Sequence, residues 1–499
     1  MLRKIRTILA CLFFAAITLM FLDFTGTLHT YLGWLAKIQF LPAVLAMNVA
    51  VVLALVVLTL LFGRVYCSVV CPLGVMQDCF SRLGGKVKKN RFGYAKNHWV
   101  LRVVVLVVFV VLMVLGLNGI AILIAPYSAY GRIATNLLQP VYMWVNNLCA
   151  YFAERAGSYA FYSAEVWVKS GVLLIVSAVT LVVIGFVSFR WGRLWCNTVC
   201  PVGTVLGFLS KFSFFKPRIN QDKCIGCKKC EKGCKAMCID VSNHRVDYSR
   251  CVACMDCIDA CPVKAIRLEA GRSVAKFAAG GSVPHADDNG AATVDTSRRK
   301  FVVTTAAVGA GMLLRAQESK VDGGLAVLED KQVPVRQVPL KPFGSVDAKH
   351  FAGRCTACQL CVSACPEHVL CPSGKLGTLM QPQMQFDRGF CRPDCTRCSE
   401  VCPTGAIRKI DASQKSAISI GHAVAVPRNC LLAQGESCNA CSRHCPTAAI
   451  GMVSDPSTGH SRIVVDESRC IGCGACEHYC PVRPFSAIYV EGRQRHTEV

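Results

Sequence analysis

Six groups of four closely spaced cysteines constrain this chain more than any other feature of its sequence. Most of the 33 cysteines fall in runs of three separated by two residues, with a fourth soon after. This spacing lets one loop present three thiolates to a 4Fe-4S cluster, while the fourth thiolate reaches a neighbouring cluster. A zinc ribbon would need two separated cysteine pairs rather than triplets. We therefore interpret the groups as ligands of six 4Fe-4S clusters.

Residues 206–270 contain the spacing of a two-cluster bacterial ferredoxin. In such ferredoxins the first three cysteines of a group bind one cluster, and the fourth binds the neighbouring cluster. The predicted sets are therefore Cys224, Cys227, Cys230 with Cys261, and Cys251, Cys254, Cys257 with Cys234. Lys235 stands where proline usually follows the fourth cysteine, and an extra Cys238 lies nearby. These departures make the position of Cys234 the least regular of the eight.

Residues 317–499 carry the other four groups, and proline follows the last cysteine in each. We expect a four-cluster module in which the outer two groups share two clusters and the inner two groups share two more. This nested arrangement predicts the sets Cys355, Cys358, Cys361 with Cys480; Cys470, Cys473, Cys476 with Cys365; Cys391, Cys395, Cys398 with Cys445; and Cys430, Cys438, Cys441 with Cys402.

Residues 1–205 are dominated by apolar segments, and 53% of the whole chain is hydrophobic. Segments 7–24, 40–62, 103–125 and 171–189 are each about long enough to cross a bilayer as a helix. Basic residues such as Arg3, Arg64 and Arg193 lie beside their ends on one side, which the positive-inside rule makes cytoplasmic. The chain is therefore expected to combine a membrane α-helical bundle, four helices in two hairpins, with α+β ferredoxin-like modules.

The helical region contains an internal repeat. Residues 63–74 match residues 192–203 without a gap, and each copy contains Cys-x3-Cys-Pro. The two copies put Cys67, Cys71, Cys196 and Cys200 at the same end of the bundle, where four thiolates could share one metal or cluster. The alternative is that these pairs are structural or form a thiol switch.

Residues 297–316 include Ser297-Arg298-Arg299-Lys300-Phe301 and then an apolar run, which is typical of a twin-arginine export signal. The alternative is an ordinary basic pair in a linker, since such signals normally open a chain. Residues 271–296, rich in Ala, Gly, Ser and Asp, form the linker before it. The apolar run has a poor cleavage site, so we expect it to remain as a fifth anchor. Loading clusters before export would protect the thiols from disulfide formation.

These motifs resemble two known families. Residues 1 to about 270 resemble NapH-type membrane ferredoxins, through four helices, two Cys-x3-Cys-Pro motifs and a two-cluster module. Residues 297–499 resemble the NapG-type partner, through the twin-arginine segment, four groups and the spacing from Asn429 to Cys441. The resemblance implies a fused iron-sulfur subunit of a quinol dehydrogenase in the bacterial inner membrane, with a periplasmic C-terminal half. It would pass electrons from menaquinol or ubiquinol to a periplasmic reductase or multihaem cytochrome.

The residues themselves favour electron transfer over hydrolytic or group-transfer chemistry. No phosphate loop, nucleophile-base pair or nucleic-acid motif accompanies the net charge of +24, part of which offsets anionic clusters. His29, near the outer end of the first helix, could accept a quinol proton, although an interfacial histidine is more often only solvated. The alternative function is electron donation for maturation or reactivation of another metalloenzyme. An ion pump would need charged residues within the spans, which offer little beyond Asp23 and Arg102.

Overall fold

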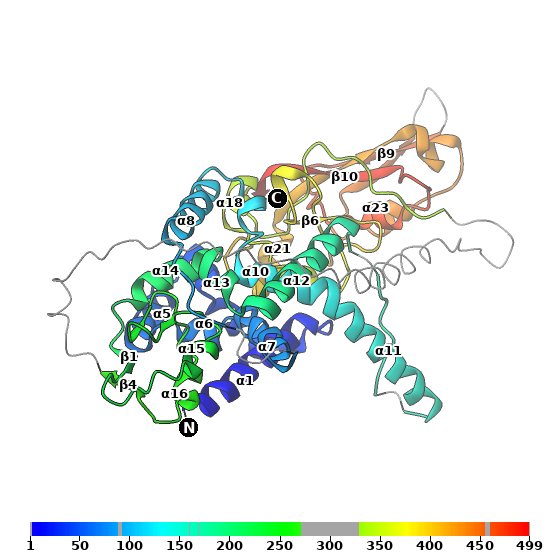
Figure 1. The fold of residues 1–499 in the computed structure, drawn as a ribbon. Helices are drawn as coiled ribbons and strands as arrows, with labels where there is room; N and C mark the ends of the chain where they lie inside the picture. Colours follow the sequence, from blue (N-terminus) through cyan, green and yellow to red (C-terminus); the bar gives the residue numbers. More distant parts are fainter. Residues whose placement is uncertain are drawn as a thin grey trace, which may run out of the picture.

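The computed structural model of this protein describes residues 2–87, 92–158, 160–167, 169–270, 329–454 and 460–498. These form a helical domain (residues 2–214), a first module (215–270) and a second module (329–498), shown in Figure 1. The predicted linker and the predicted twin-arginine segment lie outside the described residues.

Long apolar runs separated by short polar breaks make the first domain helical. Its longer helices are α1 (Leu2–Leu22), α5 (Val49–Phe62), α7 (Pro72–Val87), α8 (Trp99–Val114), α11 (Gln139–Arg155), α12 (Gly171–Trp191) and α14 (Pro201–Ser210). The shorter ones are α2 (Thr27–Leu32), α3 (Trp34–Lys37), α4 (Phe40–Leu45), α6 (Val65–Val69), α9 (Asn118–Ala121), α10 (Pro126–Ile133), the π-helix η1 (Ala134–Leu138) and α13 (Leu194–Thr198).

Two of the four predicted spans, α1 and α12, are single helices of 21 residues that are long and apolar enough to cross a membrane. The bounds predicted for the other two were wrong. Segment 40–62 divides into α4 and α5 because Met47 is left-handed (φ 53°) and Asn48 caps α5. Segment 103–125 is interrupted at Gly116, whose φ of 77° ends α8.

Both modules consist of two-stranded antiparallel sheets and short helices that carry cysteines. The first module contains β1 (Phe215–Ile219), α15 (Lys229–Lys232), β2 (Ile239–Asp240), β3 (Arg245–Val246), α16 (Asp256–Ala260) and β4 (Ile266–Ala270), with β1 paired to β4 and β2 to β3. This agrees with the predicted α+β ferredoxin-like class.

The second module repeats this construction on a larger scale. Its helices are α18 (Ala348–Arg354), α19 (Leu360–Ser363), η2 (Leu376–Thr378), α20 (Arg397–Val401), α21 (Ala412–Ser416), η3 (Pro427–Asn429), η4 (Leu431–Gln434), α22 (Ala440–Arg443) and α23 (Ala475–Tyr479). Its strands are β5 (Leu370–Pro372), β6 (Pro382–Met384), β7 (Ile418–Ala425), β8 (Ile450–Ser454), β9 (Ser461–Val465) and β10 (Ile488–Glu498). They pair as β5 with β6, β7 with β10 and β8 with β9.

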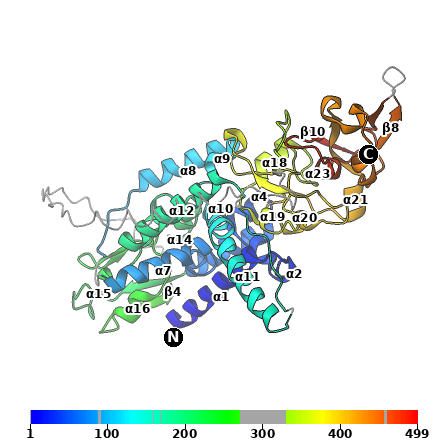
Figure 2. The ribbon, with the colours of Figure 1, turned by 90° about the vertical axis from the view of Figure 1, so that its right-hand side faces the viewer.

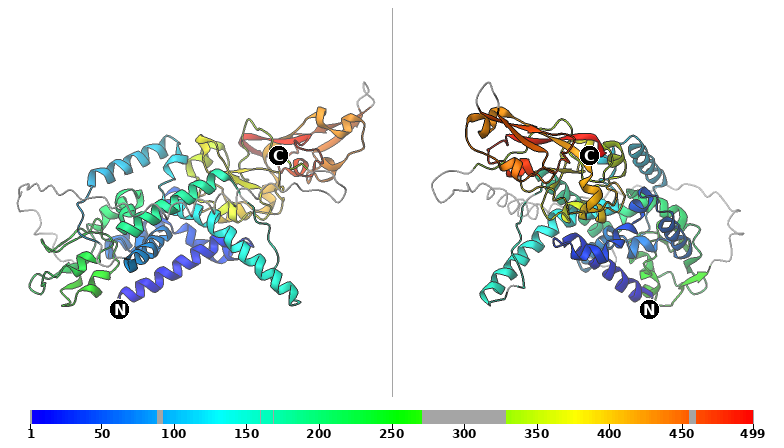
Figure 3. Two further views of the ribbon diagram at one scale, coloured as in Figure 1. Left: turned by 45° about the vertical axis from the view of Figure 1, so that its right-hand side comes forward. Right: turned by 180° about the vertical axis from the view of Figure 1, so that it is seen from behind.

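The two modules lie at opposite ends of the helical domain (Figures 2 and 3). Helix α11 projects away from the rest of the domain in the same views. One buried cluster continues from the helical domain into the second module and includes Phe21, Tyr127, Phe351 and Cys355. The first module has a separate core that includes Cys230 and Ile266.

Candidate iron-sulfur sites

Four of the six cysteine groups begin with the same backbone turn. In the first group, Gly226 before the second cysteine and Lys228 after it have positive φ angles of 68° and 55°. The equivalent pairs are Ala253 and Met255, Ala357 and Gln359, and Gly472 and Gly474. Such left-handed residues reverse the chain over a few residues, which allows three thiols of one loop to face a common point. The third cysteine then lies on the short helix that follows.

The first module has two hollows, each lined by one predicted ligand set. Cys224, Cys227, Cys230 and Cys261 line one hollow. Cys234, Cys251, Cys254 and Cys257 line the other, and Cys238 lines it as well. The structure therefore brings together each set of four that the ferredoxin spacing predicts, with a fifth thiol in the second hollow.

The surroundings of the cysteines fit 4Fe-4S clusters. Backbone N–H groups donate to several sulfurs: Ala265 to Cys261 over 3.2 Å, Ala449 to Cys445 over 3.3 Å and Ala487 to Cys480 over 3.3 Å. Hydrogen bonds of this kind stabilise the thiolate form and tune bound clusters. Within the part of the chain that the structure describes, no three His, Cys, Asp or Glu side chains converge closely enough for a single metal ion.

Burial makes these thiols dependent on bound iron. Burial raises the pKa of the third cysteine in four groups well above its ordinary value, and neighbouring thiols raise it further. These cysteines are Cys257, Cys361, Cys398 and Cys476. A buried thiol of this kind is neutral by itself at pH 7. Coordination to iron would supply the positive charge that keeps it ionised.

The second module pairs its cysteine groups differently from the nested prediction. Helix α19, with Cys361, packs against α20, with Cys398, and α22 packs against α23. Burial raises the pKa of Cys355, Cys358 and Cys361, and the nearby charge of Cys402 adds to this effect. In the same way, the charge of Cys365 adds to the raised pKa of Cys391 and Cys398. The charge of Cys445 adds to the raised pKa of Cys470, Cys473 and Cys476.

These contacts favour a pairing in which each group is completed by its neighbour along the chain, in place of the nested pairing. The contacts favour the sets Cys355, Cys358, Cys361 with Cys402; Cys391, Cys395, Cys398 with Cys365; and Cys470, Cys473, Cys476 with Cys445. By elimination, the last set would be Cys430, Cys438, Cys441 with Cys480. Pairing neighbouring groups closes shorter loops than nesting does, so it costs less chain entropy.

The four sets of the second module follow one another in space. The set with Cys358 contacts the helical domain, and a hydrogen bond of 2.9 Å from Cys391 N–H to the Cys473 carbonyl joins the second set to the third. The remaining set, with Cys438, lies near η4 and the β8–β9 pair at the distal end (Figure 1). The order of the sets therefore runs from the helical domain outward.

The Cys-x3-Cys-Pro repeat forms a further site inside the helical domain. Each of its four cysteines is less than 5% exposed: Cys67, Cys71, Cys196 and Cys200. The four thiols lie within electrostatic range of one another. Cys71 and Cys200 directly precede α7 and α14, and Gly203 N–H donates to Cys200 Sγ over 3.3 Å. The structure thus brings the four cysteines together, with Cys71 and Cys200 at the N-termini of two helices.

Each copy of the repeat holds the other through its arginine. Arg64 donates to the backbone carbonyl of Cys196 over 3.1 Å, and Arg193 donates to the carbonyl of Cys67 over 2.8 Å. Both guanidinium groups are fully buried. The positive-inside rule used these arginines to predict the cytoplasmic side of the bundle, and their burial inside the protein leaves that prediction untested. Their positive charges surround the four thiols.

Asp78 links this site to the first module. It forms ion pairs with Arg193 at 2.7 Å, Lys235 at 2.9 Å and Arg6 at 3.2 Å, and its side chain is only 6% exposed. Lys235 also pairs with Asp256, and its carbonyl accepts from Arg193 N–H over 2.8 Å. The lysine that replaces the usual proline thus connects the second hollow of the first module to the four-cysteine site.

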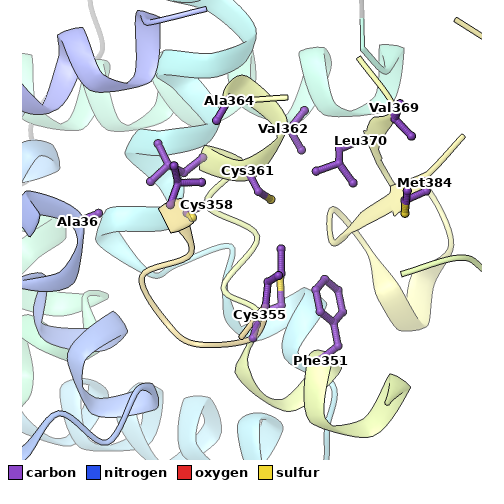
Figure 4. Packing of buried hydrophobic residues seen from close by; sticks show 14 of the residues in the cluster. Ala36, Phe351, Cys355, Cys358, Cys361, Val362, Ala364, Val369, Leu370 and Met384 are labelled. Carbon is purple, nitrogen blue, oxygen red and sulfur yellow. The ribbon is translucent and has the colours of Figure 1, made fainter. Parts of the chain in front are cut away.

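The second module contacts the helical domain at its first ligand set. A methyl group on Gly131 of α10 would collide with the Cys358 carbonyl, so the two backbones touch there. Figure 4 shows Cys355, Cys358 and Cys361 within this packed core, with Ala36 of α3 on the side of Cys358. Arg397 also donates to the Thr25 carbonyl over 3.0 Å.

Two buried tyrosines occupy the region between the four-cysteine site and the second module. Tyr66 adjoins Cys67 in sequence, and its hydroxyl donates to Gln39 Oε1 over 2.9 Å. Tyr127 of α10 is 1% exposed and lies within electrostatic range of both Cys358 and Tyr66. Closely packed side chains therefore connect the two cysteine sites.

His29 forms a buried pair that sequence reasoning did not anticipate. Its Nδ1 lies 3.1 Å from Asp23 Oδ2, and both side chains are no more than 5% exposed. Asp23 also accepts from the backbone N–H groups of Thr25, Gly26 and Leu28, which holds it in place. His29 Nε2 is buried and has no hydrogen-bond partner among the described residues. The pair can therefore accept one further hydrogen bond at this nitrogen.

Four protein-family models match parts of the chain. One described as a 4Fe-4S binding domain matches residues 44–90 and 171–220, which contain the two copies of the repeat. Another 4Fe-4S binding domain matches residues 244–267. Two models described as 4Fe-4S dicluster domains match residues 324–370 and 436–483. The match over 436–483 joins the third and fourth groups of the second module, in agreement with their packing.

Curated relatives cover about a third of the chain. The methylamine utilization ferredoxin-type protein MauM of Methylobacillus flagellatus is 31% identical over 183 residues, 34% of this chain and 75% of the relative. The ferredoxin-type protein NapG of Escherichia coli K12 is 32% identical over 206 residues, 37% of this chain and 80% of the relative. The ferredoxin-type protein NapF of the same strain is 28% identical over 152 residues, which are 30% of this chain and 85% of the relative. No solved structure matches significantly.

Proposed function

The chain belongs to the family of ferredoxin-type iron-sulfur electron-transfer proteins that includes NapG and MauM, and we propose that it relays electrons across a membrane. In this proposal it fuses a NapH-type membrane part with a NapG-type module. Quinol in the membrane supplies the electrons, and a periplasmic reductase or cytochrome receives them from the second module. Each 4Fe-4S cluster accepts and donates one electron at a time.

The observation that carries this proposal is the position of α1. Its first turn contacts the first module, where Arg3 pairs with Asp256 at 3.0 Å. Just beyond its other end, the Thr25 carbonyl accepts from Arg397 of the second module. A helix of 21 residues is about 30 Å long, which is the thickness of the hydrocarbon core. Opposite ends of one bilayer-length helix therefore contact the two modules.

Helix α12 supports the same arrangement from the other side of the domain. Leu173 near its start packs in a buried cluster with Ala357 and Met380 of the second module. Gly192, just past its end, lies against the Lys235 carbonyl of the first module. Between these contacts, both α1 and α12 expose large apolar side chains, including Leu12 at 61% and Val182 at 67%. Lipid would cover this surface more favourably than water.

The four-cysteine site is proposed to hold a seventh cluster between the modules. Its thiols would be the ligands, with Arg64 and Arg193 balancing their charge. Lys235 would fix the first module beside it, and Tyr66 and Tyr127 would exclude water from the region towards Cys358. One-electron centres exchange electrons quickly only when they lie close together, so a centre here would shorten the longest step between the modules.

The Asp23–His29 pair is proposed to take one of the two protons released when quinol is oxidised, and the other would pass to water. Two electrons and two protons leave each quinol molecule, and a base at the quinol hydroxyl favours their separation. His29 Nε2 is free to accept that hydrogen bond, while Asp23 orients the ring through Nδ1. The pair lies at the end of α1 that contacts the second module.

Anaerobic reduction by quinol tests the proposal. The full chain, purified in detergent with its clusters, is mixed with menaquinol or ubiquinol analogues while visible absorption and electron paramagnetic resonance are followed. We expect partial bleaching of the iron-sulfur absorption and signals of reduced clusters. If dithionite reduces the clusters but no quinol does, quinol is not the electron donor.

The two-sided arrangement has its own test. In intact cells, a thiol reagent or protease that cannot cross the inner membrane, admitted to the periplasm, should reach residues of the second module and spare those of the first. Protection of the second module until the membrane is opened would contradict a periplasmic position. This outcome would leave quinol reduction, measured separately on the purified chain, unaffected.

A further inference from the structure

Cys238 is a buried thiol that no ligand set uses. Five other cysteine groups have a fourth cysteine followed by proline, and in three of them the residue four positions later is a buried alanine: Ala265 after Cys261, Ala406 after Cys402 and Ala449 after Cys445. Val369 and Pro484 occupy this position in the other two groups. Cys238 occupies it after Cys234 and is 1% exposed. The first module therefore has a thiol where three other groups have a methyl group.

The thiol of Cys238 faces two predicted ligands of one set. Its Sγ lies 3.6 Å from Cys234 Sγ, and it also exchanges a side-chain hydrogen bond with Cys251. Together with Cys234, Cys251, Cys254 and Cys257 it lines a single hollow. Five thiols thus surround a site that needs four.

The other hollow of the first module offers a matched comparison. Cys224, Cys227, Cys230 and Cys261 line it, and Ala265 lines it at the position equivalent to Cys238. The two hollows belong to one small domain, and only the hollow completed by Cys234 is lined by a fifth thiol. The Cys234→Ala and Cys238→Ala variants, alone and combined, separate the effect of Cys238 from the other differences between the hollows.

We propose that Cys238 is a reserve ligand, able to replace Cys234 at the cluster held by Cys251, Cys254 and Cys257. This rests on the proposed assignment of these cysteines as cluster ligands. In the exchange, the Cys238 thiol loses its proton and binds the iron as the Cys234 thiolate leaves and takes a proton. The iron keeps one thiolate throughout, so the exchange needs no oxidant or reductant.

The position of Cys234 gives the exchange a structural setting. The next residue, Lys235, is held by Asp78, Asp256 and Arg193 at the boundary with the helical domain. The next two carbonyls also accept hydrogen bonds from the helical domain, Ala236 from Asn197 and Met237 from Ala95. Cys234 and Cys238 belong to the same buried core of the first module. Because their sulfurs lie 3.6 Å apart in this core, the exchange needs no shift of the module against the helical domain.

Iron content in the full chain tests the proposal. Iron and sulfide per chain and the paramagnetic signals of the reduced protein are measured after anaerobic purification of Cys234→Ala, Cys238→Ala, the double variant and Cys261→Ala. We expect Cys234→Ala and Cys238→Ala to keep the full iron content. The double variant and Cys261→Ala should each lose about one to four iron atoms per chain, since a cluster short of a thiolate loses one iron or all of them.

Two results would overturn the reserve ligand. One is that Cys234→Ala alone loses as much iron as the double variant. The other is that Cys238→Ala alone loses iron, which would make Cys238 the resident ligand. If instead Cys261→Ala loses no iron, the ligand assignment under the proposed function fails. Cys238→Ala introduces the residue found at the equivalent position of the other hollow, Ala265, so this variant is expected to fold.

Discussion

Arg64 donates a hydrogen bond from Nη2 to the backbone carbonyl of Cys196 over 3.1 Å, and so joins the two copies of the internal repeat. Its Nη1 also donates to Asn197 Oδ1 over 2.8 Å. Arg193 makes the reciprocal bond to Cys67, so the two copies hold each other in the same way. Contacts between the copies therefore help to position the four thiols, together with contacts within a copy such as that of Gly203 N–H with Cys200.

Arg64→Ala should destabilise the helical domain and loosen the four-cysteine site. It leaves buried acceptors unpaired, each at a cost of about 1 to 3 kcal/mol. We expect a lower unfolding temperature in detergent and lower iron content. Arg82→Ala removes an exposed arginine of α7 and should change neither quantity. Equal effects of the two substitutions would contradict the role of Arg64.

Asp78→Asn should be more damaging than either arginine substitution. Burial opposes the charge of Asp78, but Arg193 and Lys235 hold the pKa of this carboxyl below its usual range. The neutral amide would leave Arg6 and Arg193 without their ion-pair partner and Lys235 with Asp256 alone, at a cost of about 3 to 5 kcal/mol. Thermal unfolding checks this, with the exposed Asp222→Asn as control.

The pH dependence of this contribution has a definite sign. Because the folded pKa of Asp78 is depressed, its stabilisation is fully present above the unfolded value of about 3.9 and is lost only as pH falls further. The difference in unfolding temperature between wild type and Asp78→Asn should therefore be constant from about pH 5 to 8. A difference that shrinks within this interval would contradict the ion-pair cluster.

Double substitutions distinguish the two pairings of the second module. If Cys361 and Cys402 hold the same cluster, Cys361→Ala with Cys402→Ala should cost at most one cluster, about four iron atoms per chain. Cys361→Ala with Cys480→Ala should then cost two, about eight. The nested pairing predicts the reverse order, and iron analysis of the purified proteins decides between them.

Gly131→Ala should weaken the contact between the helical domain and the second module. Its methyl group would collide with the Cys358 carbonyl and press on the Phe21 ring. Overpacking of this kind costs about 1 to 3 kcal/mol. Unfolding temperature and the yield of quinol-reduced clusters should both fall. Gly85→Ala, in α7 with nothing nearby to meet its methyl group, should preserve both.

His29→Gln should slow quinol oxidation without affecting cluster content. Loss of a general base slows a reaction by about 100-fold or more. Asp23→Asn should slow it less, because the ring remains and only its orientation and charge balance change. Stopped-flow reduction by quinol measures the rate, with dithionite reduction expected to be unchanged. His98→Gln, at the exposed start of α8, is the control; a similar loss there would contradict a specific role for His29.

Local spacing was enough to identify the cluster loops, because the features that shape them are local. Three thiols two residues apart, with left-handed residues around the second, are determined within a few positions, as at Gly226 and Lys228. The apolar runs of α1 and α12 were equally visible. The broken segments were not, since a single capping residue such as Asn48 outweighed a continuous apolar run.

The sequence by itself thus determined the kind of site, its number of ligands and the two longest apolar helices. The tertiary structure was needed to favour a fourth cysteine for each group of the second module, to explain why Arg64 and Arg193 are buried, and to show that Lys235, Asp78 and Asp23 have partners. The physical reason is distance along the chain: the Arg64–Cys196 bond joins residues 132 positions apart. Such contacts depend on how whole elements pack, and no local pattern records that packing.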